Sequence, residues 1–216
     1  LLSESFSEYS SLMTMKSISK TPMAMREFIK YDHDRYLRGR SGEVEKELPL
    51  FKVENQSYIH YGKGSVILYA LQDYIGEDKV NEALKEFLDK YKYSNYYPTS
   101  LDFLKVLEKK VPDSLNYLID DWFKEITIYD NRLKTAEAKK LENGKYEITL
   151  EIESKKNKAD SIGNEKSVLL DEWIDIGFFI DEDEKELIGQ KRIKIAENTS
   201  MRSFQLDTLP VKAAID

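Results

Sequence analysis

Cysteine is absent from the 216 residues, which excludes a disulfide framework and any thiolate metal site. Histidine is nearly absent, since only His33 and His60 are present. Basic residues are outnumbered, with 33 Lys and Arg against 40 Asp and Glu, and they are spread along the chain. The resulting net charge of −7 argues against a nucleic-acid partner, whose recognition needs a basic face. Long apolar runs are also missing: the stretch 66–71 is far below the ~20 residues of a membrane span.

The remaining composition is that of a globular protein, with 41% hydrophobic and 34% charged residues. A prior of about 150 residues per domain predicts one large domain or two small ones. A helical pattern begins within the first residues, and the last six residues have the pattern of a strand. We therefore expect both ends to be cut from a longer chain.

The first part of the chain, residues 1–128, is predicted to be helical. Leu2, Phe6, Tyr9 and Met13 recur at the spacing of one helix face. The apolar stretch 58–75 ends at Gly76, a residue suited to the left-handed position after a helix. Apolar spacing or capping residues predict further helices over 80–91, 99–107 and 115–123.

The second part, residues 129–216, is predicted to be a β-sandwich of immunoglobulin-like type. Residues 146–152 alternate apolar and polar side chains, behind an Asn143-Gly144 turn. A second alternating run covers 174–180, and shorter ones cover 187–195, 201–206 and 211–215, giving six or seven strands. The polar stretch 155–166 is predicted to be a mobile loop. The fold class is therefore α+β in two parts.

Two segments carry residues with possible chemistry. Glu4 falls opposite the apolar face of the first helix, with Glu8 one turn later; the simplest interpretation is a solvated surface glutamate. Tyr61 stands in the sequence Y-G-K-G, residues 61–64, immediately before an apolar helix. The simplest interpretation there is a glycine-loosened helix entry, because the spacing of a phosphate-binding loop is absent.

Taken together, the two segments resemble the aminopeptidase N family of zinc peptidases. Residues 3–9, S-E-S-F-S-E-Y, are similar to the family's N-E-G-F-A-x-Y, and residues 61–64 match its Y-x-K-G element. The two elements stand in the family's order, with Tyr61 following Glu4 by 57 positions. The helices and the sandwich behind them also follow the family's layout.

The resemblance implies a zinc-dependent aminopeptidase that acts on peptides. Glu4 would be the third zinc ligand, and Tyr61 would face the scissile carbonyl. The family's H-E-x-x-H, which supplies two ligands and the general base, does not occur in these residues. We therefore expect it upstream, in a missing N-terminal half-domain of the intact parent. On this interpretation the present fragment is the C-terminal half of a catalytic domain plus its sandwich, holds no zinc alone and is inactive alone.

The sequence departs from the family's pattern at two positions. Ser3 replaces the family's asparagine, and Ser5 replaces its glycine, which could alter how the backbone approaches substrate. One alternative is therefore a non-catalytic binding or scaffolding relative that keeps the fold. Another is a helical adaptor joined to an immunoglobulin-like module. Residues 34–49 resemble bacterial members joined to transporter-like membrane segments, which would make the parent membrane-tethered.

The roles of the remaining candidates stay open at this stage. His60 is expected to be a wall of the substrate cleft or a packed residue. A metal site made of His33, His60 and Glu4 is conceivable, although the spacing fits no common ligand pattern. Arg35, Arg38 and Arg40 are expected either to bind a carboxylate or to hold a loop through ion pairs.

Overall fold

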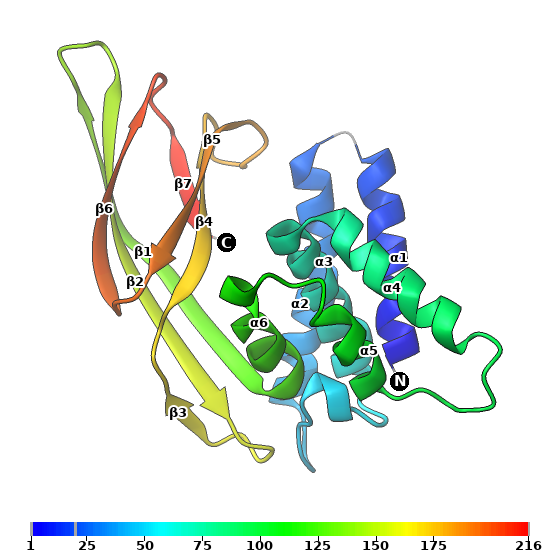
Figure 1. The fold of residues 1–216 in the computed structure, drawn as a ribbon. Coiled ribbons are helices and arrows are strands. Elements are labelled where there is room, and N and C mark those ends of the chain that lie inside the picture. The colour runs from blue at the N-terminus through cyan, green and yellow to red at the C-terminus, as the bar shows by residue number, and fades with distance from the viewer. Residues whose placement is uncertain (1, 20, 216) are drawn as a thin grey trace. The chain divides into compact units, whose positions relative to one another are not determined.

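The computed structural model describes residues 2–19 and 21–215 and divides them into two compact units (Figure 1). The helical unit extends to Thr127 and includes Ala159–Asn164, while the sheet unit comprises Ile128–Lys158 and the chain from Glu165 onward. Helices are followed by two antiparallel sheets, which confirms the predicted fold class. In the described part of the chain, no helix combines the length and the apolar character needed to cross a bilayer.

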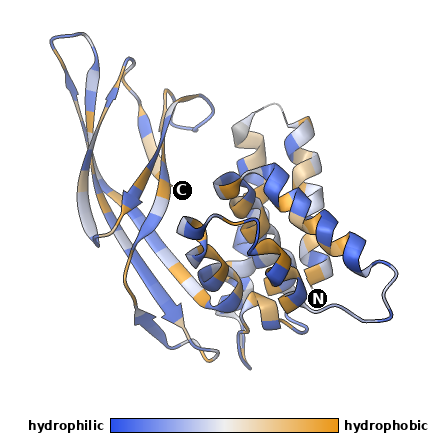
Figure 2. Ribbon diagram, in the orientation of Figure 1, coloured by the Kyte–Doolittle hydropathy of each residue, from blue (hydrophilic) through white to orange (hydrophobic). Residues whose placement is uncertain are grey.

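Four long helices and several short turns build the helical unit. The long helices are α1 (Leu2–Ile18), α2 (Pro22–Ser41), α3 (Gly64–Ile75) and α4 (Glu77–Tyr91). The shorter elements are η1 (Leu50–Lys52), η2 (Tyr58–Lys63), α5 (Ser100–Leu107), η3 (Asp113–Leu115), α6 (Tyr117–Ile119) and η4 (Asp120–Lys124). Apolar and polar positions are interspersed along the helices (Figure 2), and buried apolar side chains of α1, α3, α4 and the later short elements form a core that includes Leu68, Leu71, Phe103 and Phe123.

Two segments predicted as single helices are broken. The stretch 58–75 begins as the π-helical turn η2 and continues as α3, and it ends at Gly76, where φ is +97°. The stretch 115–123 consists of the 3-10 turn η3, one turn of α6 and the π-helical turn η4. Hydrophobic spacing does not distinguish an α-helical turn from a π-helical one, because each buries the same kind of side chain.

Glycines allow the helices around η2 to approach one another closely. A Cβ on Gly64 would lie 2.1 Å from Ser5 Oγ and 2.7 Å from Ser5 Cβ, so α1 touches the start of α3 there. A Cβ on Gly62 would lie 2.9 Å from the backbone oxygen of Asp32 and 3.2 Å from the backbone nitrogen of Tyr36, both in α2. The two glycines of the Y-G-K-G sequence therefore fit α1 and α2 against the same short segment.

The sheet unit has seven strands in the described part of the chain. They are β1 (Ile126–Lys140), β2 (Tyr146–Ala159), β3 (Glu165–Ser167), β4 (Glu172–Phe179), β5 (Leu187–Ile195), β6 (Thr199–Leu206) and β7 (Lys212–Ile215). In one sheet β2 pairs with β1, β3 and β6; in the other β4 lies between β5 and β7. Ile148 and Leu150 of the first sheet share a core with Ile176 and Phe178 of the second. This shared core is the arrangement expected of a sandwich.

The prediction of a mobile loop over 155–166 is wrong for most of that stretch. Strand β2 continues to Ala159, and β3 begins at Glu165 after a turn in which Gly163 has φ +86°. Lys156 keeps the inward direction of the preceding alternation and forms a buried ion pair with Glu172. Burial of such a charge is tolerated because its partner is buried beside it.

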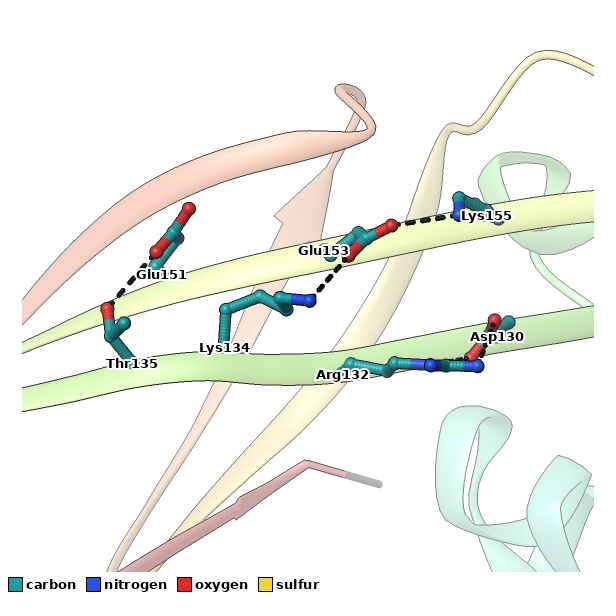
Figure 3. A network of polar contacts seen from close by, with 7 residues as sticks. All are labelled: Asp130, Arg132, Lys134, Thr135, Glu151, Glu153 and Lys155. Carbon is teal, nitrogen blue, oxygen red and sulfur yellow. Dashed lines mark hydrogen bonds and ion pairs between the residues drawn. The ribbon is translucent and has the colours of Figure 1, made fainter.

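The polar side of the β1–β2 hairpin carries a network of charges (Figure 3). Glu153 pairs with both Lys134 and Lys155, and Arg132 binds Asp130 through two hydrogen bonds of 2.7 and 2.9 Å. These side chains are largely solvated, so each pair contributes little to the stability of the fold. The network forms the solvated face of the hairpin and does not indicate a functional site.

Replacement of Gly64 by alanine should destabilise the helical unit. The added methyl group would overlap Ser5, and overpacking of this kind costs about 1–3 kcal/mol of unfolding free energy. The measurement is urea denaturation of the wild type, Gly64→Ala, Ser5→Gly and the double variant. Because Ser5→Gly removes the overlapping atoms, Gly64→Ala should cost clearly less in that background. The matched control is Gly42→Ala, where the nearest atom to the new methyl is 3.6 Å away; equal costs for the two alanines would contradict the close approach.

Candidate functional site

Glu4 and Tyr61 come together at the point where α1 meets η2. Glu4 lies in the first turn of α1 and Tyr61 in the π-helical turn, and both side chains are half-buried. The Tyr61 hydroxyl interacts with the Glu4 carboxylate. This interaction, together with burial, raises the pKa of Tyr61, while the charge of Arg35 acts in the opposite direction. The hydroxyl therefore keeps its proton near neutral pH.

The residues next to this pair in the sequence, Ser5 and His60, connect α1 to η2. The Ser5 hydroxyl is fully buried and donates a hydrogen bond of 2.7 Å to the backbone oxygen of His60. Ser5 thus faces η2 and α3. The His60 ring lies 4.7 Å from the Tyr61 ring, centroid to centroid. Burial lowers the pKa of His60, which favours a neutral imidazole packed against the tyrosine.

A metal site made of His33, His60 and Glu4 is not formed. Among the described residues, no three His, Cys, Asp or Glu side chains gather closely enough to hold an ion. His33 is exposed on α2, whereas His60 is buried in η2. Of these three residues, Glu4 and His60 lie beside Tyr61.

The three candidate arginines near the end of α2 separate into two roles. The Arg40 Nε lies 2.9 Å from Glu47 Oε2, so Arg40 holds the loop after α2 through an ion pair. The Arg35 guanidinium carbon lies 4.8 Å from the centroid of the Tyr61 ring, at the distance of a cation–π contact. Arg35, Arg38 and Tyr31 line a surface hollow of about 390 Å³.

Behind Tyr61 lies a buried polar network that the sequence alone did not indicate. Glu47 accepts a hydrogen bond of 2.7 Å from the Tyr36 hydroxyl, and its backbone N–H donates to the Ser161 oxygen. Lys63 Nζ is 5.3 Å from the centroid of the Tyr36 ring and forms no hydrogen bond among the described residues. The Y-G-K-G sequence carries one signal for the burial of Lys63. A lysine between two glycines that are in close helix contacts has little access to water.

Burial lowers the pKa of Lys63 from 10.5 to about 8, although the charge of Glu47 opposes this and that of Arg40 reinforces it. The shift corresponds to a cost of about 3 kcal/mol for keeping the lysine charged in the folded state. Below pH 8 both folded and unfolded chains carry the charge and the whole cost applies. Between pH 8 and 10.5 the folded chain binds fewer protons than the unfolded chain, so this group makes stability rise with pH.

Lys63→Met should therefore stabilise the fold at pH 7 and lose that advantage at high pH. The expected gain at pH 7 is about 1–3 kcal/mol, because methionine fills similar space without a charge. Urea denaturation of both proteins at pH 7, 8.5 and 10 gives the difference in unfolding free energy, which cancels other titrating groups. The control is Lys85→Met at an exposed position on α4. A Lys63→Met protein that is less stable than the wild type by the same amount at every pH would refute the buried-charge cost.

Comparison with known proteins identifies the family of this chain. The chain is 27% identical over 191 residues to tricorn protease-interacting factor F2 of Thermoplasma volcanium, a match covering 80% of this chain and 24% of that protein. It is 36% identical over 64 residues to probable aminopeptidase 2 of Sulfurisphaera tokodaii, covering 30% of this chain and 8% of that protein. Residues 1–122, which contain Glu4, Tyr61, Glu47 and Lys63, match the peptidase family M1 domain. The chain therefore belongs to peptidase family M1.

Proposed function

We propose that this chain supplies part of the active site of a zinc-dependent aminopeptidase, with Glu4 as a zinc ligand and Tyr61 as a hydrogen-bond donor to the reacting carbonyl. The observation that carries the proposal is the proximity of these two side chains, which stand 57 positions apart in the sequence and on different elements. Both lie within the residues that match the M1 peptidase domain. The name of one relative, probable aminopeptidase 2, favours removal of N-terminal residues from peptides.

The rest of the site is proposed to lie outside these 216 residues. The chain spans 24% of the length of one relative and 8% of the other. A catalytic zinc site uses three protein ligands and leaves a position open for water, whereas the described residues bring no such set together. The residues present thus do not form a zinc site by themselves. An H-E-x-x-H in an N-terminal half-domain would complete the set, and the chain alone would be inactive.

The chemistry assigned to this chain belongs mainly to Tyr61. Zinc, when bound, supplies Lewis acidity and acidifies a water molecule. As negative charge develops on the carbonyl oxygen of the scissile bond, a protonated phenol in a fixed position can donate a hydrogen bond to it. The π-helical turn fixes the Tyr61 ring against His60 and Arg35. A donor of this kind contributes about 10²–10³-fold to the rate.

The organisation of the parent follows from the same assignment. Residues 1–128 are proposed to be the helical portion of the catalytic domain, and residues 129–216 the sandwich domain that follows it. The missing half-domain is the expected partner of the α1 face that carries Glu4. Attachment of the parent to a membrane, suggested by the sequence around residues 34–49, stays a prediction.

In the full-length protein, Tyr61→Phe should lower kcat for peptide hydrolysis about 100-fold or more while the zinc content stays at one ion per chain. Glu4→Ala should instead lower the zinc content itself, because it removes one of three ligands. The measurements are steady-state hydrolysis of an aminoacyl amide and metal analysis after dialysis.

Tyr93→Phe is the matched control, since Tyr93 is 91% exposed and lies outside the site. Wild-type protein without zinc-dependent hydrolysis would overturn the proposed function and assign the chain to a non-catalytic member of the family. Full activity in both Glu4→Ala and Tyr61→Phe would overturn the assignment of these two residues.

A further inference from the structure

One face of α2 gathers positive charge beside Tyr61. Tyr31, Arg35 and Arg38 follow one another at the i, i+4, i+7 spacing of a single helix face and together line the hollow of about 390 Å³. The Arg35 guanidinium lies over the Tyr61 ring at 4.8 Å. The hollow therefore adjoins the residue that we assign to the reacting carbonyl.

Among the described residues neither guanidinium of this face forms a close ion pair, although the charge of Arg35 acts on Asp32 and that of Arg38 acts on Asp34. Arg38 Nε donates to the backbone oxygen of Asp34, while the Asp34 carboxylate pairs with Lys30 at 2.7 Å. Asp32, the acidic residue nearest in sequence on the other side, is buried and accepts a hydrogen bond from Ser65. By contrast Arg40, Arg132 and Arg192 each pair with a carboxylate at 2.6–2.9 Å.

We propose that Tyr31, Arg35 and Arg38 form a subsite that binds a carboxylate of the peptide being cleaved. Two guanidinium groups on one helix face repel each other, and a planar carboxylate relieves that repulsion while accepting two parallel hydrogen bonds from an arginine. The inference rests on the proposed aminopeptidase function, because it takes the Tyr61 hydroxyl as the position of the scissile bond. It goes beyond that function by naming a feature of the substrate, a carboxylate, that this chain recognises.

The distances limit where the carboxylate can be. Arg35 contacts the Tyr61 ring directly, and Arg38 lies one helical turn, about 5 Å, further along α2. An extended peptide advances about 3.4 Å per residue. The carboxylate therefore belongs within about one to three residues of the scissile bond. It is either an acidic side chain there or the C-terminus of a short peptide.

The test compares three peptides in the full-length protein: alanyl-glutaminyl-alanine amide, alanyl-glutamyl-alanine amide, and alanyl-glutaminyl-alanine with a free carboxyl group. The first has no carboxylate, the second has one on a side chain and the third has one at the C-terminus. We expect kcat/KM to be about 10-fold higher for the second or third peptide than for the first, mainly through a lower KM. Which of the two is preferred identifies the source of the carboxylate.

The preference should fall below about twofold in Arg35→Ala and Arg38→Ala combined, and Arg35→Lys should retain part of it because the charge remains. The control is Arg26→Ala, which removes one positive charge from the exposed, opposite side of the same helix and should leave the preference intact. Use of the ratio between peptides removes any uniform effect of Arg35 on Tyr61. Equal kcat/KM for all three peptides, or a preference that survives the double replacement, would overturn the subsite.

A second readout separates this inference from the proposed function. Calorimetric binding of the three peptides to Tyr61→Phe, which keeps the aromatic ring, does not require turnover. If the wild type hydrolyses peptides but neither readout discriminates between them, the subsite is wrong and the aminopeptidase function stands. If the wild type hydrolyses none of them, yet Tyr61→Phe binds a carboxylate peptide about 10-fold more tightly through Arg35 and Arg38, the function fails and the subsite stands.

Discussion

The contact between Ser5 and Gly64 sets the position of every other part of the candidate site. Ser5 is the residue after Glu4, and Gly64 is three residues after Tyr61, so the distance between the two helices at this contact fixes the distance between the carboxylate and the phenol. The Ser5 hydroxyl adds a hydrogen bond to the His60 backbone and leaves no room for a side chain at residue 64. Because folded interiors are close-packed, an added methyl group here would force α1 or the start of α3 to shift. The spacing of Glu4 and Tyr61 thus depends on the contact of the Ser5 side chain with the backbone at Gly64.

The cost of burying Lys63 is a second constraint, and it acts against stability. A charged lysine that lacks a direct ion pair loses the hydration it has in the unfolded chain, and the attraction of Glu47 offsets only part of that loss. The same region nevertheless ties α2, the loop after it and the 159–164 turn to η2, through Tyr36, Arg40 and the Glu47 backbone. Networks of buried charge of this kind order a segment at a cost in free energy, and groups with perturbed pKa values cluster at functional sites. The π-helical turn that carries Tyr61 is that segment here.

The sequence predicts the layers of this protein better than its local turns. Apolar spacing identified the helical part and the sheets, because burial of one face requires a period near 3.6 or 2 whatever the exact backbone. The same criterion failed at Lys156, where the inward alternation of β2 continues with a charged residue whose partner, Glu172, is distant in sequence. Glu4 and Tyr61 were found only through motif resemblance, since nothing in their local pattern separates them from surface residues. The roles of Arg35 and Arg40 could not be divided from sequence, because a single helical turn separates a residue facing Tyr61 from one facing Glu47.

The electrostatics around Tyr61 decide between two kinds of chemistry. A phenol that acts as a general base must lose its proton near the working pH, whereas a donor to a developing oxyanion must keep it. Arg35 alone would favour the first, because a guanidinium over the ring stabilises a phenolate. Glu4 favours the second, since its carboxylate, together with burial, raises the pKa of Tyr61 and outweighs the opposing charge of Arg35. In the residues of this chain these effects support the donor role that is proposed for Tyr61. Arg35 forms no close ion pair among the residues that the structure describes. Its charge can therefore attract a carboxylate of the substrate, as the proposed subsite requires.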